Sequence, residues 1–268
     1  MTFGCCIREA ENIRMLKQLG FDYYEFAGFA AARMDAAEFD RLCAVTERVG
    51  LPCLGFNAYC SGRPAIVGPD FNAREIRSYA EKICSRGAQL GIRSIGIGAP
   101  RARRLSPQYS REKAMQECRT FLAITGEIAE KYSLRVLFES VHDRMCDFAN
   151  TIPEALAVLE GMERDVFGLV LDFYHLEVMG ENLDVLASAS PWLSHVHVSS
   201  CEADLGRSFP QESELPLYSR RFYSLQQLGY HGSVSIEADH FEEKPAARSL
   251  QMLREAAENA AVKDTRKR

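Results

Sequence analysis

One local pattern recurs along the chain: a short β-prone apolar run, a segment whose apolar residues recur with helical period, and a turn. The strand-like runs cover residues 3–7, 21–26, 53–57, 94–97, 135–139, 168–172, 193–198 and 234–237. The helix-like segments cover residues 10–19, 36–49, 73–90, 111–131, 152–159, 183–188, 218–228 and 246–260. Alternation of this kind predicts βα units that form a parallel sheet covered by helices.

Eight such units within about 250 residues predict an α/β fold of the (β/α)8 TIM-barrel type. A doubly wound sheet is the alternative, but it usually has fewer units and a glycine-rich first turn. The first turn here, residues 7–10, contains no glycine. We therefore expect the barrel.

No linker or low-complexity stretch divides the 268 residues, so we expect one domain over residues 1–260 and a polar tail over 261–268. The longest irregular segments, 59–72, 100–110, 141–150 and 199–216, all follow strand ends. In a barrel they would meet at the C-terminal face, where active sites are built.

The overall charge argues against a nucleic-acid partner. The net charge of -5 is opposite to the basic surface that phosphate-backbone binding needs. No apolar run approaches the roughly 18 residues that a membrane span requires, and the N-terminal sequence lacks a signal-peptide pattern. A cytoplasmic protein is expected.

The nine cysteines predict neither disulfides nor a zinc site. Their number is odd, and no Cys-x-x-Cys pair occurs. Cys43, Cys53, Cys84 and Cys118 stand among apolar residues and are expected to be reduced core thiols.

Four successive late strands end in residues that can bind metal: Glu139, Asp172, His197 and Glu237. A single charged residue at a strand end commonly points to water or pairs with an arginine. Four in sequence order favour one divalent cation, because unpaired carboxylates at the edge of a core are costly. Three carboxylates and one imidazole suit Mn²⁺, the expected ion, or Mg²⁺, and tolerate Co²⁺ or Zn²⁺.

Two further histidines lie beside these residues. His175 follows Asp172 in Asp-Phe-Tyr-His. This position favours contact with substrate, or an outer-shell contact with a metal ligand, over simple packing. His195 precedes His197 by two residues on one strand, so both face the same side. We expect His197 nearer the mouth to be the ligand and His195 to lie one layer deeper.

Strands five and eight stand on opposite sides of the expected metal, so Glu139 and Glu237 would flank a bound substrate. Two carboxylates around one carbon are what two-base proton transfer needs, with a metal polarising the adjacent carbonyl. The expected products are an epimer or an aldose–ketose isomer of a small polyhydroxy carbonyl compound.

These residues resemble the xylose isomerase-like TIM-barrel superfamily, whose members include sugar phosphate isomerases and epimerases. The motifs that carry the resemblance are Phe-Glu139-Ser, Leu-Asp172-Phe-Tyr-His175, His195-Val-His197-Val and Ile-Glu237. The resemblance implies that Glu139, Asp172, His197 and Glu237 bind the metal and that Glu139 and Glu237 are also the acid–base pair. It further implies that His175 and Arg207 contact substrate.

The chain departs from the family pattern in two places. His197 and Arg207 are farther apart than in the ketose epimerases, and Met145 stands where those enzymes carry a substrate-contacting Glu. The endonuclease IV branch takes histidine ligands from early strands, whereas the first histidine here is His142. Its three-metal site is therefore not expected.

The early strands also end in polar residues. Glu25, Asn57 and Arg101 are candidates for substrate binding, and each has a structural role as its alternative. An arginine pair, Arg101 with Arg103, would suit a phosphate or a carboxylate better than a neutral sugar.

Three functions remain open from the sequence. The first is a metal-dependent isomerase or epimerase, the second a dehydratase of the inosose or dehydroshikimate type, and the third a barrel that binds a sugar without turning it over. A homodimer and a monomer are both compatible with the sequence.

Overall fold

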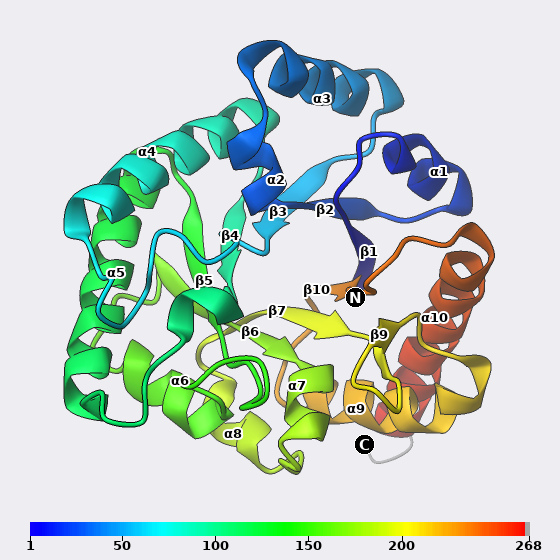
Figure 1. Cartoon of the computed structure of the whole chain (residues 1–268). Coiled ribbons are helices and arrows are strands. Elements are labelled where there is room, and N and C mark those ends of the chain that lie inside the picture. Colours follow the sequence, from blue (N-terminus) through cyan, green and yellow to red (C-terminus); the bar gives the residue numbers. More distant parts are fainter. Residues whose placement is uncertain (266–268) are drawn as a thin grey trace.

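The structure is a computed structural model that describes residues 1–265. Eight strands form a closed barrel in the order β1-β10-β7-β6-β5-β4-β3-β2, and every neighbouring pair is parallel (Figure 1). The predicted TIM barrel is confirmed. Its strands are β1 (Thr2–Ile7), β2 (Tyr23–Ala27), β3 (Cys53–Asn57), β4 (Ser94–Ile97), β5 (Arg135–Glu139), β6 (Phe167–Asp172), β7 (Leu193–Val198) and β10 (Ser233–Ile236).

Helices surround the barrel on all sides (Figure 1). The longer ones lie where the apolar periodicity predicts them, and two short helices, α2 and α7, were not predicted. Six residues are too few to show a helical period, and both helices begin directly after a strand. The helices are α1 (Asn12–Leu19), α2 (Gly28–Arg33), α3 (Ala36–Val49), α4 (Ala73–Leu90), α5 (Arg111–Lys131), α6 (Ile152–Leu159), α7 (Phe173–Val178), α8 (Val185–Ala189), α9 (Leu215–Gln227) and α10 (Glu243–Thr265).

The expected polar tail begins inside a helix. α10 continues to Thr265, five residues past the boundary that we predicted at residue 260. Residues 266–268 of that tail lie outside the described residues.

Polar side chains fill the barrel interior in layers. Gly4 of β1 pairs with Tyr23 of β2, and a Cβ at position 4 would lie 2.1 Å from the Tyr23 ring, so glycine is what lets this ring enter the barrel. The Tyr23 hydroxyl accepts a hydrogen bond from Ser235 of β10 at 3.0 Å. Residues two positions further along the same strands lie in the layers above.

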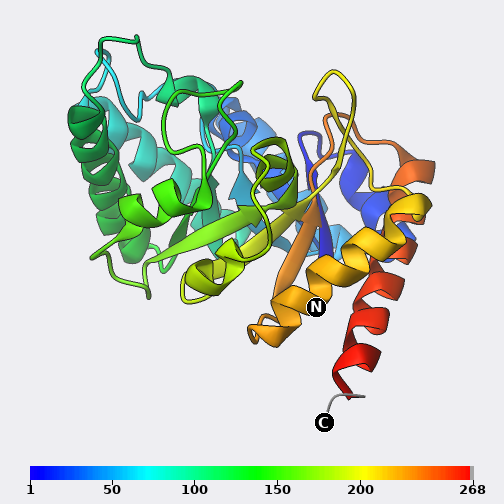
Figure 2. The same ribbon diagram turned by 90° about the horizontal axis from the view of Figure 1, so that it is seen from below.

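The four long irregular segments all follow barrel strands, as predicted, and two contain short regular elements. Residues 100–110 include the 3₁₀ helix η1 (Pro100–Arg103). Residues 199–216 include the hairpin strands β8 (Ser200–Cys201) and β9 (Arg207–Ser208) and the 3₁₀ helix η2 (Glu212–Glu214). Figure 2 shows this hairpin projecting from the barrel on the side away from the N-terminus.

None of the nine cysteines, all within the described residues, is in a disulfide. Cys53, Cys84 and Cys118 are buried as expected, and Cys43 is half-buried. Within residues 1–265, the helices are too short or too polar to cross a membrane.

Candidate metal centre and substrate cavity

The four predicted ligands meet at the C-terminal mouth of the barrel. Glu139 and Asp172 end β5 and β6, His197 lies in β7, and Glu237 directly follows β10. These strands are consecutive around the barrel, and Asp172 pairs with His197 in register. One possible ligand atom from each of the four residues lies within 4.8 Å of the others.

The atoms that face one another here fit a divalent cation. Nδ1 of His197 lies 3.5 Å from Glu139 Oε1 and 3.3 Å from Glu237 Oε2. Among the described residues, no hydrogen-bond partner reaches Glu139 Oε1 or His197 Nδ1, although both atoms are buried. Leaving such groups unpaired is costly, and a hard cation with oxygen and imidazole ligands would satisfy both.

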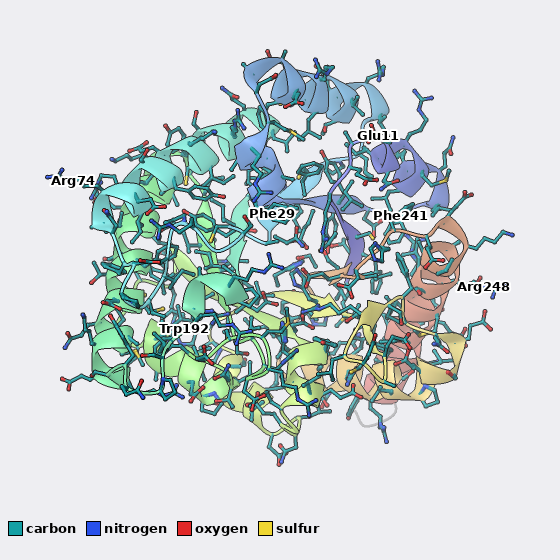
Figure 3. All side chains as sticks on the ribbon, in the orientation of Figure 1. Glu11, Phe29, Arg74, Trp192, Phe241 and Arg248 are labelled. Carbon is teal, nitrogen blue, oxygen red and sulfur yellow. The ribbon has the colours of Figure 1, made fainter. Side chains whose placement is uncertain are left out.

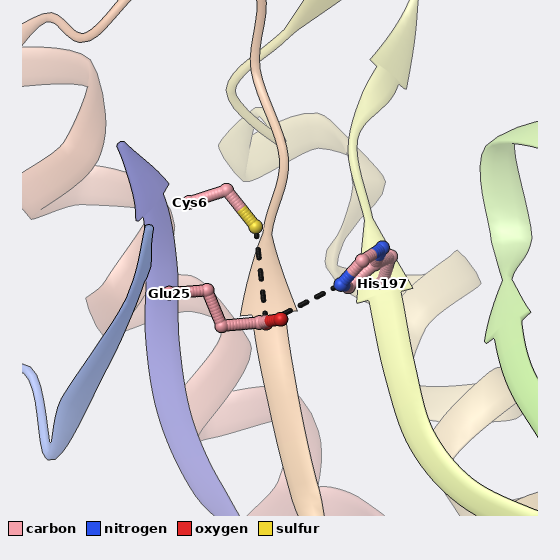
Figure 4. A group of neighbouring side chains, drawn as sticks. All are labelled: Cys6, Glu25 and His197. Carbon is pink, nitrogen blue, oxygen red and sulfur yellow. Dashed lines mark hydrogen bonds and ion pairs between the residues drawn. The ribbon is translucent and has the colours of Figure 1, made fainter. Parts of the chain in front are cut away.

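A second group, Cys6, Glu25 and His197, also lies within ligand distance (Figure 4). Its atoms already have partners. Glu25 Oε1 lies 2.6 Å from His195 Nε2 and 3.3 Å from His197 Nε2, and it accepts a long contact of 3.8 Å from the Cys6 thiol. We therefore interpret the group as support for His197 and not as a second metal site.

This arrangement changes our interpretation of Glu25. We expected its carboxylate at a strand end in contact with substrate, but it lies one layer below the cavity and is not part of the cavity wall. His195 lies in the same deep layer, as expected, and its Nδ1 is 2.6 Å from the Ser233 hydroxyl. Both histidines were placed in the right order by their spacing in β7.

A cavity of about 370 Å³ opens above the four ligands, at the small end of the usual range for small-molecule sites. Glu139, Glu237, His175, Arg207 and Arg101 all line it. Asn57 instead lines an adjoining recess, and its amide donates a hydrogen bond of 3.0 Å to Glu237 Oε1. Asn57 therefore orients Glu237.

Glycine makes room for one of the catalytic candidates. A Cβ at position 98 would lie 2.4 Å from Glu139 Oε2, closer than side-chain atoms approach. Gly98 follows β4 directly and lines the same cavity. Its absent side chain leaves the space that the Glu139 carboxylate occupies.

Arg207 reaches into the site from the β8–β9 hairpin. Its guanidinium donates to Glu237 Oε2 and pairs with Asp172 Oδ2, both at 2.7 Å. The guanidinium carbon also lies 4.3 Å from the centre of the Tyr174 ring. The β8–β9 hairpin therefore accounts for the long sequence separation of His197 and Arg207, because it brings the arginine back to the mouth of the barrel.

His175 lies next to this arginine. It is buried in α7, and its Nε2 is 2.7 Å from Arg207 Nη2. Burial first and the Arg207 charge second lower the pKa of His175 to about 3. The ring is therefore neutral at pH 7.

The two glutamates are in opposite electrostatic environments. Burial raises the pKa of Glu139, and the nearby carboxylates add to this effect while His197 opposes it. Burial also acts on Glu237, but the Arg207 guanidinium and the His197 ring outweigh it and hold the Glu237 pKa well below its ordinary value. Carboxyl pairs with separated pKa values are typical of acid–base catalysis.

The predicted arginine pair separates into two roles. Arg103 is fully buried, and its guanidinium donates to the backbone carbonyls of Gly98, Phe148 and Ala149. Arg103 is therefore a structural residue, and only Arg101 lines the cavity. The two side chains point in different directions because they are two positions apart in a 3₁₀ helix. The sequence did not predict this helix, so it could not separate their roles.

Several cavity residues were not identified from the sequence. Arg8, Phe29, Arg33 and Asp239 line the cavity, and Met145 also forms part of its wall. Arg8 follows β1 directly, a signal like that of the predicted residues, and Asp239 lies three residues past the end of β10. Phe29 and Arg33 belong to the unpredicted helix α2.

A family model described as "Xylose isomerase-like TIM barrel" matches residues 13–256 of this chain. The chain belongs to this family. The structural likeness agrees: an L-ribulose 3-epimerase superposes with a TM-score of 0.81 at 17% identity, covering 99% of this chain and 97% of that one. A structure of the IolI protein with a bound zinc atom superposes with a TM-score of 0.71 at 18% identity, covering 98% and 99% of the two chains.

Curated proteins with similar sequences are named as isomerases and epimerases. An inosose isomerase from Halalkalibacterium halodurans is 28% identical over 181 residues, which is 62% of this chain and 62% of that protein. A probable ketose 3-epimerase from Synechocystis is 25% identical over 252 residues, covering 90% of this chain and 82% of that protein. The match to the inosose isomerase thus spans less than two thirds of its length.

Proposed function

We propose that this protein is a divalent-metal-dependent isomerase or epimerase of a small polyhydroxy carbonyl compound. The observation that carries the proposal is the pair Glu139 and Glu237, which line one cavity from β5 and from the end of β10, with β6 and β7 between them in the barrel. The names of the similar curated proteins support the same reaction class.

Glu139, Asp172, His197 and Glu237 would hold the metal, with Mn²⁺ as the proposed ion. A bound divalent cation would polarise the substrate carbonyl and increase the acidity of the neighbouring C–H group. The zinc in the IolI structure supports a metal in barrels of this shape.

The two glutamates would divide the proton transfer. Glu237, kept ionised by Arg207, accepts the proton from the carbon next to the carbonyl. Glu139, on the other side of the cavity, returns a proton. Return to the same carbon gives an epimer. Return to the former carbonyl carbon, with transfer of the hydroxyl proton to the former carbonyl oxygen, gives an aldose–ketose isomer. Glu237 ends protonated and Glu139 ionised.

Arg207 and His175 would position the substrate. Both line the cavity beside Glu237, and Arg207 can shift a hydrogen bond from a carboxylate to a substrate oxygen without losing its charge. The Asn57 amide, which donates to Glu237, keeps that carboxylate oriented toward the cavity.

Product analysis tests this proposal. The protein is loaded with Mn²⁺ and incubated with ketoses, ketose phosphates and inososes, and products are identified by NMR and mass spectrometry. We expect a product of unchanged mass that disappears after chelation and returns when metal is restored. A product lighter by one water would identify a dehydratase instead. Absence of any metal-dependent product would refute both enzymatic functions.

A further inference from the structure

Three arginines on the wall of the cavity have no acidic partner. Arg8 follows β1, Arg33 ends α2 and Arg101 lies in η1, and all three line the cavity that holds Glu139 and Glu237. Within residues 1–265, none of the three forms an ion pair. Arg207, by contrast, is already paired with Asp172 and Glu237.

Two of these arginines approach one loop, residues 61–62. Arg33 donates a hydrogen bond of 2.6 Å to the Ser61 hydroxyl. The Arg101 Cβ lies 3.3 Å from the position that a Cβ on Gly62 would occupy. Arg33 and Arg101 therefore both lie beside this loop, and both are exposed residues on the wall of the same cavity.

Away from the metal site, most of this wall is uncharged, and Asp239 is its one acid. Phe29, Pro100, Val141 and Met145 are uncharged. Asp239 is the remaining acid outside the metal site, and its carboxylate accepts a hydrogen bond of 2.8 Å from the Arg207 backbone. Like charges on one small cavity repel each other, and an anion bound between them removes that cost.

Phe29 helps to hold Arg33 at the cavity. The Arg33 guanidinium carbon lies 5.5 Å from the centre of the Phe29 ring. Figure 3 shows Phe29 on the inner side of the helix ring, toward the barrel axis. A guanidinium that is stacked and hydrogen-bonded in this way loses less freedom when it binds an anion.

We infer that the cavity takes an anionic substrate, with a phosphate or carboxylate group held by Arg33 and Arg101 and with Arg8 as a third cation. The planar guanidinium matches the oxygens of both anions. The reacting end of the substrate, next to Glu139 and Glu237, rests on the proposed function, whereas the anion site does not depend on it.

Anion binding to the metal-free protein tests this inference, because chelation removes any metal ion, which would itself attract an anion. Inorganic phosphate and acetate are titrated separately by calorimetry into the wild type, Arg33→Gln, Arg101→Gln and the double variant. Loss of a charged hydrogen bond predicts about tenfold weaker binding for each single variant. Arg74→Gln is the control, since Arg74 is exposed and lies at the outer edge of the molecule (Figure 3).

Saturable binding of phosphate with this variant pattern supports a phosphate ester, and the same pattern with acetate alone supports a carboxylate. No saturable binding of either anion, or equal binding by the double variant, would overturn the inference. Turnover of neutral ketoses without anion binding would refute the anion site and leave the proposed function intact. Anion binding without turnover of any substrate would support the anion site and refute the proposed function.

Discussion

The Glu25 carboxylate lies 3.3 Å from Nε2 of His197, on the side of the ring opposite to the nitrogen that faces Glu139 and Glu237. A carboxylate in this position holds a proton on Nε2 and leaves the Nδ1 lone pair free for a metal. His195 and Ser233 continue the chain of contacts behind Glu25.

Replacing Glu25 with Gln should therefore weaken metal binding without removing a ligand. Loss of such a supporting carboxylate typically lowers metal affinity by about 10–100-fold. Equilibrium dialysis with Mn²⁺ measures the effect, and circular dichroism checks the fold. The matched control is Cys6→Ser, because the Cys6 thiol makes only a 3.8 Å contact to the same oxygen. Wild-type affinity in Glu25→Gln would contradict this role.

Replacing Arg207 with Gln should destabilise the metal-free protein more than the metal-loaded one. Its removal leaves Asp172 and Glu237 as buried carboxylates without a cation, a change that typically costs about 3–5 kcal/mol. A divalent cation bound by the same carboxylates restores much of this loss. Urea unfolding with and without Mn²⁺ gives the two free energies.

The control for that experiment is Arg254→Gln. Arg254 pairs with Asp22 at 3.5 Å, and both side chains are more than 40% exposed, 43% and 42%. An exposed pair contributes at most about 1 kcal/mol, and its loss should be the same with and without metal. If Mn²⁺ stabilised Arg207→Gln no more than it stabilised the wild type, this prediction would be wrong.

His175 should make stability depend on pH. Its pKa is lowered from 6.5 to about 3 in the folded protein, chiefly by burial, so between these values the unfolded chain binds one more proton. The free energy of unfolding of the metal-free protein should then fall with decreasing pH, with a contribution of about 1.4 kcal/mol per pH unit from this residue. The total loss in the free energy of unfolding is greatest near the lower end of that pH range.

His175→Gln removes this contribution. Urea unfolding between pH 6 and pH 4.5 should give a shallower dependence for His175→Gln than for the wild type, because other groups contribute to both proteins and cancel in the difference. His231→Gln, a change at an exposed histidine, should keep the wild-type slope. Equal slopes for wild type and His175→Gln would show that His175 is not held neutral by burial.

Most of the fold could be predicted from the sequence because the alternation of strand-like and helix-like segments recurs along the chain. The predicted bounds of β3, β4, β5 and β7 agree with the structure, since each is an apolar run with clear ends. α2 and α7 were missed because they are too short to show a period. The hairpin β8–β9 depends on contacts that no local pattern encodes.

The site was accessible only in part. Strand ends identify which residues reach the mouth, and this principle located Glu139, Asp172, His197 and Glu237. It does not say how deep a side chain lies, so Glu25 was expected in contact with substrate and lies below the cavity. Arg33 was missed, because its place on the cavity wall follows from the unpredicted α2.

Proton transfer through Glu139 and Glu237 is the central claim, and solvent deuterium tests it most directly. The Mn²⁺-loaded protein is incubated in deuterated water with a substrate that it converts, and the product is examined by NMR. We predict solvent deuterium at the reacting carbon, because both carboxyl groups line an open cavity and exchange their protons with water. Product that forms with no deuterium at that carbon would contradict proton transfer by these two glutamates.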